Sequence, residues 1–190
     1  GASSGKTTFS QRLTRALPNS DFIGTDDFVI GDRSYRRKYL EGNNPLKKYN
    51  IGLFNNIIRK IRQLKKGDLI KVPSYDEKTG LAADAKTYNH TINGNINYLI
   101  VEGDFDLVEK PDYKIFFYVP DYIRLQNRIN RDKRQRNESD TENIVQNFEL
   151  RQKLQHIPYT LSSLKTADLI IYVTENNSQY IYSIYIKKKK

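Results

Sequence analysis

The chain has 190 residues, enough for one domain with a sizeable hydrophobic core and a small lid. It has no cysteine, which excludes disulfides and cysteine-ligated zinc, and its two histidines leave little for a histidine-based metal site or a catalytic triad. No apolar run approaches the length that crosses a bilayer and no signal peptide is visible, so we expect a soluble cytoplasmic protein without a membrane partner.

The net charge of +10 fits two classes of protein. A basic chain binds nucleic acid, or it binds small anions such as nucleotides in a positive cleft. Much of the excess charge lies in separate clusters, in residues 35–48, 124–136 and 187–190. Scattered clusters favour the small anion, so we expect no nucleic-acid partner.

The first eight residues form most of a phosphate-binding loop that opens a helix. They are Gly1, Ala2, Ser3, Ser4, Gly5, Lys6, Thr7 and Thr8. Small residues let successive backbone N–H groups curl around a phosphate, and the positive end of the helix dipole points to the same place. Lys6 would then reach the terminal phosphates of a nucleotide, and the Thr7 hydroxyl would complete a Mg²⁺ shell.

The full loop pattern needs one more glycine ahead of Gly1 and an apolar strand before it. Both are missing, so we expect that the chain as given lacks its real N-terminus. The alternative interpretation is a flexible terminus rich in serine and glycine.

Residues 6–16 carry apolar side chains at helical spacing, which predicts a helix that ends before Pro18. Residues 21–24 predict a short strand, followed by Asp26 and Asp27. The carboxyl ends of strands line the ligand crevice of an open parallel sheet, so this acidic pair would face the phosphates. An exposed turn with helix-capping aspartates is the alternative.

Residues 30–49 are polar, basic and rich in Tyr, Gly and Asn, which predicts a long irregular segment of the kind that often carries function. Residues 50–64 separate apolar and basic side chains onto opposite faces, which predicts a helix that stops at Gly67. Residues 69–76 predict a strand, and a polar loop is expected from there to about residue 95.

Residues 98–101 are four apolar residues followed by Glu102. This pattern is typical of a buried parallel strand that delivers a carboxylate at its C-terminal edge. Placed after a phosphate loop in the chain, such a carboxylate would order Mg²⁺ and its waters.

Residues 114–119 predict a further buried strand, and a helix begins at Asp121. Three arginines share one face of that helix and would close on a phosphate chain like a lid. They are Arg124, Arg128 and Arg131. Asp132 lies four residues from both Arg128 and Arg136, so ion pairs would hold the arginines in place. A solvated, salt-bridged helix face is the alternative interpretation.

The last third of the chain predicts one more helix and a hairpin. Residues 138–155 have the helical pattern, with Ser139 as the N-cap and Glu142 three positions later. Residues 167–173 predict a core strand, and the alternation in residues 180–186 predicts a terminal hairpin.

In this order, the motifs resemble the uridine kinase and phosphoribulokinase group of P-loop kinases, and uridine-cytidine kinases in particular. The motifs are residues 1–8, 25–28, 64–67 leading into 72–76, 100–103, and 128–132 continuing to Arg136. The resemblance runs over nearly the whole chain. It is specific for the fold and for ATP-dependent phosphoryl transfer, and less specific for the acceptor.

The resemblance implies an α/β protein of the P-loop NTPase type, with three layers, a mostly parallel sheet, helices on both faces and an arginine-rich helical lid. We expect a single domain over residues 1–190, with the lid at about 121–140 and acceptor-site segments at about 26–50 and 73–95. The first strand of this fold is apparently absent from the chain as given.

The resemblance also implies roles for residues. Lys6 would hold the β- and γ-phosphates within the loop of residues 1–8, and Asp26 would take the proton from the acceptor hydroxyl. Arg128 and Arg131 would bind and neutralise the transferred phosphoryl group. The implied metal site comprises Thr7, Asp26 and Glu102. The implied acceptor site comprises Asp26, Tyr75, Asp76, Arg136 and Gln146. The cofactors would be ATP and Mg²⁺, and a homo-oligomer is left open.

Several acceptor positions depart from the family pattern. Val29 stands where uridine-cytidine kinases usually have an aromatic residue, and no histidine follows Tyr75 and Asp76 within a few residues. Asn137 and Glu138 replace a glycine and a basic residue after the last lid arginine. The phosphate and metal positions therefore match the family while several base-reading positions do not.

The leading prediction is a kinase that transfers the γ-phosphate of ATP to a hydroxyl of a nucleoside such as uridine or cytidine. Kinases of the same fold with nicotinamide riboside, pantothenate, glycerate or another sugar-like acceptor are the alternative. A non-catalytic nucleotide-binding relative also stays open. A GTP-dependent switch is disfavoured because the guanine-reading motif is not seen, and a nucleic-acid ATPase because no basic, aromatic stripe is seen.

Overall fold

The computed structural model describes residues 3–41, 44–76, 79–82, 90–103, 107–135, 138–177 and 179–187. Three residues expected to bind phosphate or acceptor, Gly1, Ala2 and Arg136, lie outside the described residues. The chain forms two compact units, one of Gly5–Gly103 and the other of Gly1–Ser4 with Asp104–Lys190. Each unit is described by itself, and the expected single domain stays a prediction.

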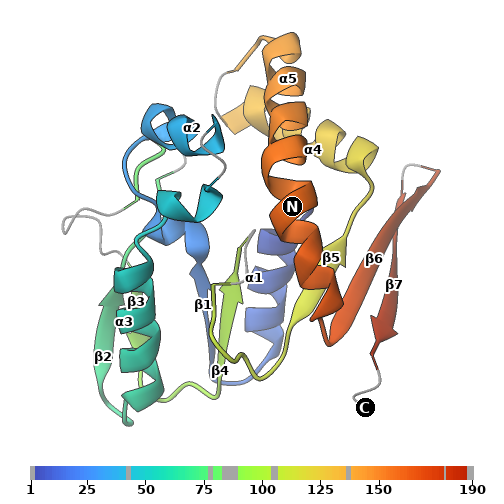
Figure 1. Cartoon of the computed structure of the whole chain (residues 1–190). Coiled ribbons are helices and arrows are strands. Elements are labelled where there is room, and N and C mark those ends of the chain that lie inside the picture. Colours follow the sequence, from blue (N-terminus) through green and yellow to red (C-terminus); the bar gives the residue numbers. More distant parts are fainter. Residues whose placement is uncertain are drawn as a thin grey trace. The chain divides into compact units, whose positions relative to one another are not determined.

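The unit Gly5–Gly103 is built on a parallel strand pair covered by a helix (Figure 1). Strand β1 (Ser20–Gly24) pairs with strand β4 (Tyr98–Glu102), and helix α1 (Lys6–Ala16) packs on both strands. The register places Gly24 opposite Glu102 at the carboxyl ends of the two strands. These three elements are confirmed close to their predicted bounds.

A second pair of strands in this unit is antiparallel. Strand β2 (Leu69–Val72) pairs with β3 (His90–Asn93), and helix α3 (Ile51–Gln63) contacts β2. Helix α3 and the strand at residue 69 were predicted, but β3 lies inside the segment expected to be a loop. The buried face of α3 comprises Phe54, Ile57, Ile58 and Ile61, as its apolar spacing predicted.

The prediction that residues 30–49 are irregular is wrong. Helix α2 (Arg33–Glu41) and the 3-10 helix η2 (Pro45–Lys48) occupy most of them. The sequence of α2 is mostly polar, and its apolar residues Tyr35, Tyr39 and Leu40 make only a short stripe, too little for a periodicity argument to detect. Its start is set instead by Asp32, whose carboxylate accepts the N–H of Tyr35 at 2.7 Å.

The other unit holds a three-stranded sheet in the order β5-β6-β7. Strand β5 (Ile115–Tyr118) runs parallel to β6 (Leu169–Asn176), and β6 pairs antiparallel with β7 (Gln179–Ile186). Figure 1 shows the β6–β7 hairpin in red, with β7 as the outermost strand of this sheet. The strands predicted at residues 114–119 and 167–173 are confirmed as β5 and β6, and the predicted terminal hairpin is confirmed as β6–β7.

Helices α4 (Asp121–Gln135) and α5 (Thr141–Arg151) pack against each other in this unit, and η3 (Gln152–Thr160) continues α5 as a π-helix. The predicted N-cap of α5 is wrong by one residue. Asp140, not Ser139, accepts the N–H of Asn143 at 3.1 Å. Asp caps as well as Ser does, so composition could not separate the two positions.

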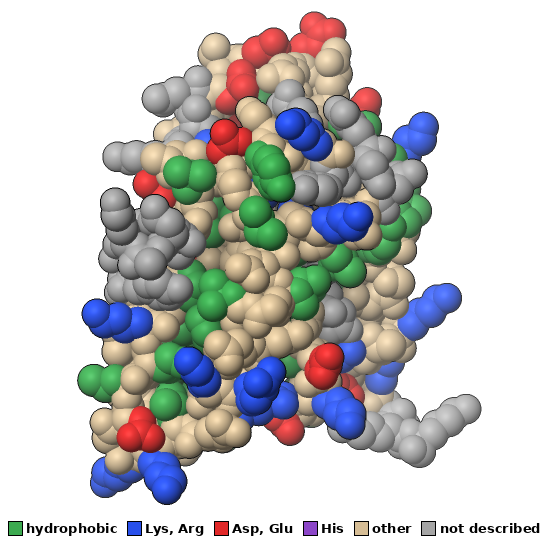
Figure 2. Space-filling view, turned by 60° about the vertical axis from the view of Figure 1, so that its left-hand side comes forward, with side chains coloured by type: hydrophobic (Ala, Val, Ile, Leu, Met, Phe, Trp, Pro, Cys, Tyr) green, Lys and Arg blue, Asp and Glu red, His purple; other side chains and the backbone are tan. Residues whose placement is uncertain are grey.

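The α/β class with parallel strand pairs is thus as predicted. No helix among the described residues is long and apolar enough to cross a membrane. Figure 2 shows several Lys and Arg side chains at the lower end of the face it presents, with hydrophobic side chains among and above them. In the unit Gly5–Gly103, exposed basic side chains follow the polar face and the end of α3: Arg59, Lys60, Arg62, Lys65 and Lys66.

Candidate active site

Three predicted residues meet where α1 begins and β4 ends. The Thr7 hydroxyl donates to the Glu102 carboxylate at 3.1 Å, and the Lys6 ammonium lies 3.7 Å from the other oxygen of that carboxylate. Gly5 caps the helix with φ of 81°, a left-handed conformation that glycine adopts without strain. The structure therefore brings a cation, a hydroxyl and a carboxylate to the N-terminus of a helix.

This donor set suits a nucleotide with Mg²⁺. A hydroxyl and a carboxylate are oxygen ligands of the kind Mg²⁺ prefers, and kinases supply only one or two such groups because phosphate and water fill the remaining positions. Among the described residues no group of three or more His, Cys, Asp or Glu could hold a metal. Thr7 and Glu102 would hold Mg²⁺, and Lys6 with the N–H groups of α1 would hold phosphate oxygens.

Ser3, in the other unit, has a buried hydroxyl oxygen with no hydrogen-bond partner among the described residues. Its φ of 61° is unusual for a residue with a side chain. Its carbonyl accepts from the Asn127 amide at 3.3 Å, and the Tyr180 hydroxyl donates to the same amide at 3.1 Å. An orphaned buried hydroxyl in a strained turn fits a loop shaped for a ligand oxygen. No sequence motif indicated Asn127 or Tyr180.

The two aspartates after β1 differ in their surroundings. Asp27 accepts the N–H groups of Gly24 at 2.9 Å and Tyr75 at 2.8 Å. Burial raises the pKa of Asp27 above its ordinary value, although these hydrogen bonds oppose the shift. Asp26 is exposed at the same strand end. Asp27 therefore holds the backbone, while Asp26 is placed to meet a ligand.

Gly103 allows β4 to approach the segment that carries Asp26. A Cβ atom at Gly103 would lie 2.2 Å from the hydroxyl oxygen of Thr25, a residue that is only 2% exposed. Only glycine permits this distance. The sequence indicates that Gly103 ends a strand, but its close contact with Thr25 could be recognised only in the structure.

The predicted acceptor residue Tyr75 is held from two sides. Its N–H donates to Asp27, and the Arg36 guanidinium lies over its ring at 5.8 Å from the centroid. Arg36 also donates to the Gly80 carbonyl at 2.8 Å, so it ties helix α2 to the loop after β2. Arg36 was missed because its partners are far away in the sequence.

Asp76, also predicted to bind the acceptor, is exposed and accepts the N–H of Thr79 at 3.4 Å within its own turn. Gln146 lies on α5 in the other unit and donates to Glu142 at 3.3 Å. Both contacts are local and leave the acceptor roles of Asp76 and Gln146 as predictions.

His90, the first residue of β3, forms an ion pair with Asp21 of β1. Its Nε2 lies 2.8 Å from Asp21 Oδ1, joining the start of β3 to β1. The hydrogen bond to Asp21 raises the pKa of His90, aided by the charges of Asp21 and Asp27 and opposed by burial. The imidazolium form is therefore favoured when the pair is closed.

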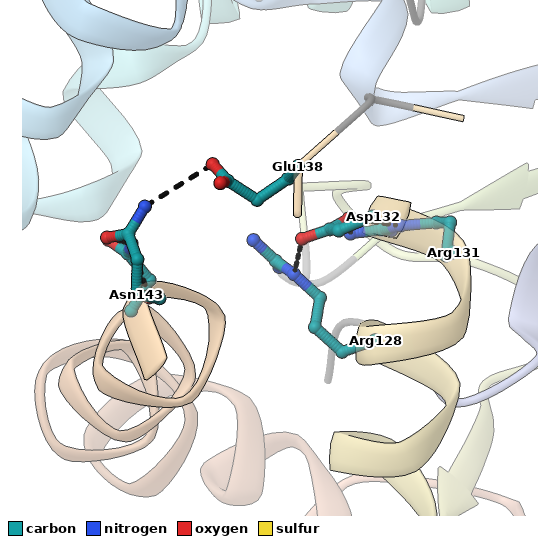
Figure 3. A network of polar contacts seen from close by, with 6 residues as sticks. Arg128, Arg131, Asp132, Glu138 and Asn143 are labelled. Carbon is teal, nitrogen blue, oxygen red and sulfur yellow. Dashed lines mark hydrogen bonds and ion pairs between the residues drawn. The ribbon is translucent and has the colours of Figure 1, made fainter. Parts of the chain in front are cut away.

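Two arginines of α4, Arg128 and Arg131, share the carboxylate of Asp132 (Figure 3). The Asp132 carboxylate accepts a close hydrogen bond from Arg128 Nε and a second, at 3.0 Å, from Arg131. Arg128 is 5% exposed and Asp132 4% exposed, so the pair is buried. The predicted ion pair is confirmed for Arg128, and it orients both guanidiniums from one anchor.

Arg124 has a different role from its helical neighbours. It is 2% exposed, donates to the Val119 carbonyl at 3.2 Å and to Asp121 at 2.6 Å, and its guanidinium lies over the Phe148 ring. Burial opposes the shift, but the hydrogen bond and charge of Arg124 lower the pKa of Asp121. The expectation that Arg124 joins a phosphate-binding face is wrong, because its side chain is used in the core.

Glu138 stands where the family pattern has a basic residue, and the structure gives it a local role. Its carboxylate accepts from Asn143 at 3.3 Å and from the N–H of Asp140 at 3.3 Å (Figure 3). Its own N–H donates to the Asp132 carbonyl at 3.1 Å. Glu138 therefore fastens the end of α4 to the start of α5.

Comparisons with known proteins agree with this geometry. A uridine kinase of Ureaplasma parvum serovar 3 is 29% identical over 201 residues, covering 97% of this chain and 91% of that protein. A uridine kinase of Borrelia turicatae is 25% identical over 189 residues, covering 96% and 87%. The structure of phosphoribulokinase from Rhodobacter spheroides has a TM-score of 0.57 at 16% identity, covering 88% of this chain and 65% of that one, which shows a common P-loop kinase fold.

The family match extends almost to the end of the chain. The model of the phosphoribulokinase / uridine kinase family matches residues 1–179, which include Lys6, Asp26, Glu102 and Arg128. It stops at the first residue of β7. The chain belongs to the phosphoribulokinase / uridine kinase family.

Proposed function

We propose that this protein is an ATP-dependent kinase that transfers the γ-phosphate to a hydroxyl of a nucleoside of the uridine or cytidine kind. One observation carries the proposal. Lys6, Thr7 and Glu102 contact one another beside the strand end that presents Asp26, because Glu102 pairs with Gly24 in the register of β1 and β4. The names of the curated relatives support the acceptor class.

Phosphoryl transfer depends on positioning and on neutralising charge, and the residues present serve both needs. When bound, ATP supplies the phosphoryl group and Mg²⁺ offsets its charge. Lys6 and the N–H groups at the start of α1 would orient the phosphate oxygens, and Thr7 and Glu102 would hold the metal. Asp26, which we also propose to lie near the metal, would accept the proton that leaves the acceptor hydroxyl.

Asp26 is a better general base than its neighbour. Asp27 already accepts two backbone N–H groups, and protonation would weaken both hydrogen bonds. Asp26 is exposed, so its carboxylate can reach a substrate hydroxyl without leaving another donor unsatisfied. We therefore assign catalysis to Asp26 and support of the acceptor segment to Asp27.

The arginines of α4 would neutralise the transferred group. Asp132 fixes Arg128 and Arg131 through its two carboxylate oxygens. A guanidinium held by one partner loses less side-chain entropy when it binds a phosphoryl oxygen. These two arginines are the ones we propose to act in transfer.

The acceptor is the finer part of the proposal. Tyr75, Asp76 and Gln146, with Arg136, are the residues we propose for its binding. The departures at Val29 and after Asp76 leave nicotinamide riboside, pantothenate and glycerate as alternative acceptors on the same catalytic residues. ATP is abundant in the cytoplasm, where we propose the protein acts.

The test is a coupled ADP-release assay with Mg-ATP against uridine, cytidine, nicotinamide riboside, pantothenate and glycerate. We expect release that depends on uridine or cytidine. Asp26→Asn should lower kcat by about 10²–10⁴-fold and leave ATP affinity nearly unchanged. Asp112→Asn, a change of an exposed aspartate on a loop of the other unit, is the matched control and should have wild-type turnover.

The outcomes separate the parts of the proposal. ADP release with only one of the other acceptors would change the proposed substrate and leave the proposed roles of Lys6, Asp26 and Glu102 unchanged. Unchanged turnover in Asp26→Asn would refute the assignment of the base. ATP binding without a phosphorylated product across the panel would contradict the kinase itself and indicate a binding role.

A further inference from the structure

Strand β7 is an edge strand with uncovered apolar side chains on both faces. Within the described residues its only strand neighbour is β6. Six of its side chains are 44–69% exposed: Tyr180, Ile181, Tyr182, Ile184, Tyr185 and Ile186. On β6 the core-facing Ile171 and Val173 are 4% and 3% exposed, but their neighbours across the pair, Ile184 and Tyr182, are not covered.

β7 lacks the features that normally protect a sheet edge. Edge strands avoid aggregation by being short, or by carrying charges, proline or bulges. β7 has eight residues, Gln179–Ile186, without a charged residue or a proline, and its pairing with β6 is continuous. The family model matches residues up to 179, the first residue of β7.

The sequence of β7 is complementary to itself when reversed about Ser183. An antiparallel copy centred there would place each tyrosine opposite an isoleucine and Ser183 opposite itself. The pairs are Tyr180 with Ile186, Ile181 with Tyr185, and Tyr182 with Ile184. Aromatic residues opposite β-branched residues are among the favourable cross-strand pairs.

The backbone agrees with this register. The N–H of Lys187 donates to the Asp168 carbonyl at 2.9 Å, which continues the β6–β7 ladder. Because the direction of the backbone groups alternates, the odd-numbered residues of β7 bond to β6 and the even-numbered ones point to the free edge. Centring on Ser183 pairs even with even residues, so Tyr182 and Ile184 would exchange both hydrogen bonds across the new edge.

We propose that two copies of this chain dimerise through antiparallel β7–β7 pairing about a two-fold axis at Ser183. The two β5-β6-β7 sheets then join into one continuous sheet. Such an isologous contact uses the same surface on both subunits and closes on itself, which prevents the open edge from propagating.

Charge favours the antiparallel arrangement. The hairpin end of the strand pair carries Glu175 and the other end carries Lys187, followed in the sequence by three more lysines. An antiparallel copy brings the lysine end of one chain to the glutamate end of the other. A parallel copy would place lysines beside lysines, which is unfavourable.

The size of the surface fits a small interface. A large aromatic side chain hides about 150–250 Å² when fully buried, so half-exposed side chains along β7 present on the order of 500 Å² per copy. Edge-to-edge pairing covers only part of this surface, so two copies bury on the order of 1,000 Å² at most, the lower limit for a specific interface. A reversible dimer is therefore expected rather than an obligate one.

The first test is the concentration dependence of the molar mass in solution, by sedimentation velocity on the full chain. We expect a monomer–dimer equilibrium. Ile184→Lys puts a charge opposite Tyr182 of the second copy, with the lysine of that copy diagonally across the axis, and should weaken the dimer roughly tenfold or more. Leu69→Lys changes a strand residue of the other unit that is 70% exposed and should leave the dimer unchanged.

The second test fixes the register by cross-linking. The chain has no cysteine, so Ser183→Cys introduces a single thiol. In a non-hydrogen-bonded antiparallel pair the Cα atoms are about 4.5 Å apart, within the range of a disulfide. Mild oxidation should therefore link two copies of Ser183→Cys rapidly. Gln179→Cys, which would face Lys187 of the second copy, should link slowly.

Three outcomes would overturn the proposal. These are a monomer at every concentration, a dimer that Ile184→Lys leaves intact, and equal cross-linking of the two cysteine variants. A monomer that binds anionic vesicles through β7 would assign the surface to lipid and would also contradict the dimer. Circular dichroism of each variant separates loss of the dimer from loss of the fold.

Discussion

The carboxyl edge of the β1–β4 strand pair has two parts: a phosphate end beside α1, where we propose that ATP binds, and an acceptor end beside Tyr75, where we propose that the acceptor binds. The two parts are built differently. At the phosphate end the contacts join side chains, with Glu102 touching both Lys6 and Thr7. At the acceptor end the contacts run through the backbone, where Asp27 holds the N–H groups of Gly24 and Tyr75. The reacting carboxylate we propose, Asp26, is left exposed.

This difference indicates which part of the site can change between related kinases. The phosphate end is made by elements in direct contact, a helix start and a strand end, so it suits the step that all such enzymes share. The acceptor end depends on Arg36, from the polar helix α2, and on Tyr75, from the loop after β2. Substitutions in those segments can alter the acceptor without disturbing phosphate binding.

The largest expected effect is at the phosphate end. Lys6→Ala removes the cation that faces Glu102 and the phosphates, and should lower kcat/KM by about 10²–10³-fold, as removal of one charge-stabilising donor does. Steady-state kinetics with varied Mg-ATP measures this loss. Lys66→Ala, a change of an exposed lysine in the turn after α3, is the matched control. Equal activity of both variants would contradict the assignment of Lys6.

Much of the phosphate end could be predicted from the sequence. Gly5, Lys6 and Thr7 are contiguous, and Glu102 ends an apolar run whose strand character is plain. The direct contact of Thr7 with Glu102 follows from the parallel pairing of β1 with β4 and from the packing of α1 on both strands. The geometry of such short motifs can be predicted from the sequence, because a helix start and a strand end each fix the direction of the next side chain.

The acceptor end could not be predicted in the same way. Helix α2 has only a short apolar stripe among polar residues, and β3 was placed in a loop because its four residues lie in a polar segment. The links from Arg36 to Gly80 and from Asp27 to Tyr75 join residues 44 and 48 positions apart. Such contacts depend on tertiary packing and leave no periodic signal.

The contact between Gly103 and Thr25, which lies between the two ends, leaves no room for a larger side chain at position 103. Gly103→Ala would place a Cβ 2.2 Å from the Thr25 hydroxyl oxygen, so the buried Thr25 or the end of β4 must shift. We expect a loss of about 1–3 kcal/mol in the free energy of unfolding, measured in urea. Gly52→Ala adds a methyl group whose nearest neighbour is at 3.8 Å and should be neutral or stabilising. Equal stability of the two variants would refute the close contact.

At the acceptor end, Asp27→Ala leaves the N–H groups of Gly24 and Tyr75 without their acceptor. The expected cost is about 1–2 kcal/mol in stability, because burial already disfavours the charged carboxylate and offsets part of the loss. The KM for the acceptor should rise more than the KM for ATP. Steady-state kinetics with each substrate varied measures this contrast with Lys6→Ala, and an equal rise in both KM values would contradict it.

The smallest expected effect is a pH dependence from the His90–Asp21 pair. The hydrogen bond to Asp21 raises the folded-state pKa of His90 above its unfolded value of 6.5. The folded protein therefore binds the His90 proton more tightly than the unfolded chain does. The stabilisation is complete at a pH below the unfolded-state pKa and is lost as the pH rises through the folded-state pKa. His90 is 41% exposed, so solvent screening keeps the effect below about 1 kcal/mol. Urea unfolding on both sides of this window should show wild type losing stability toward alkaline pH more than His90→Gln does. Parallel pH curves for the two proteins would show that the pair is too open to couple β3 to β1.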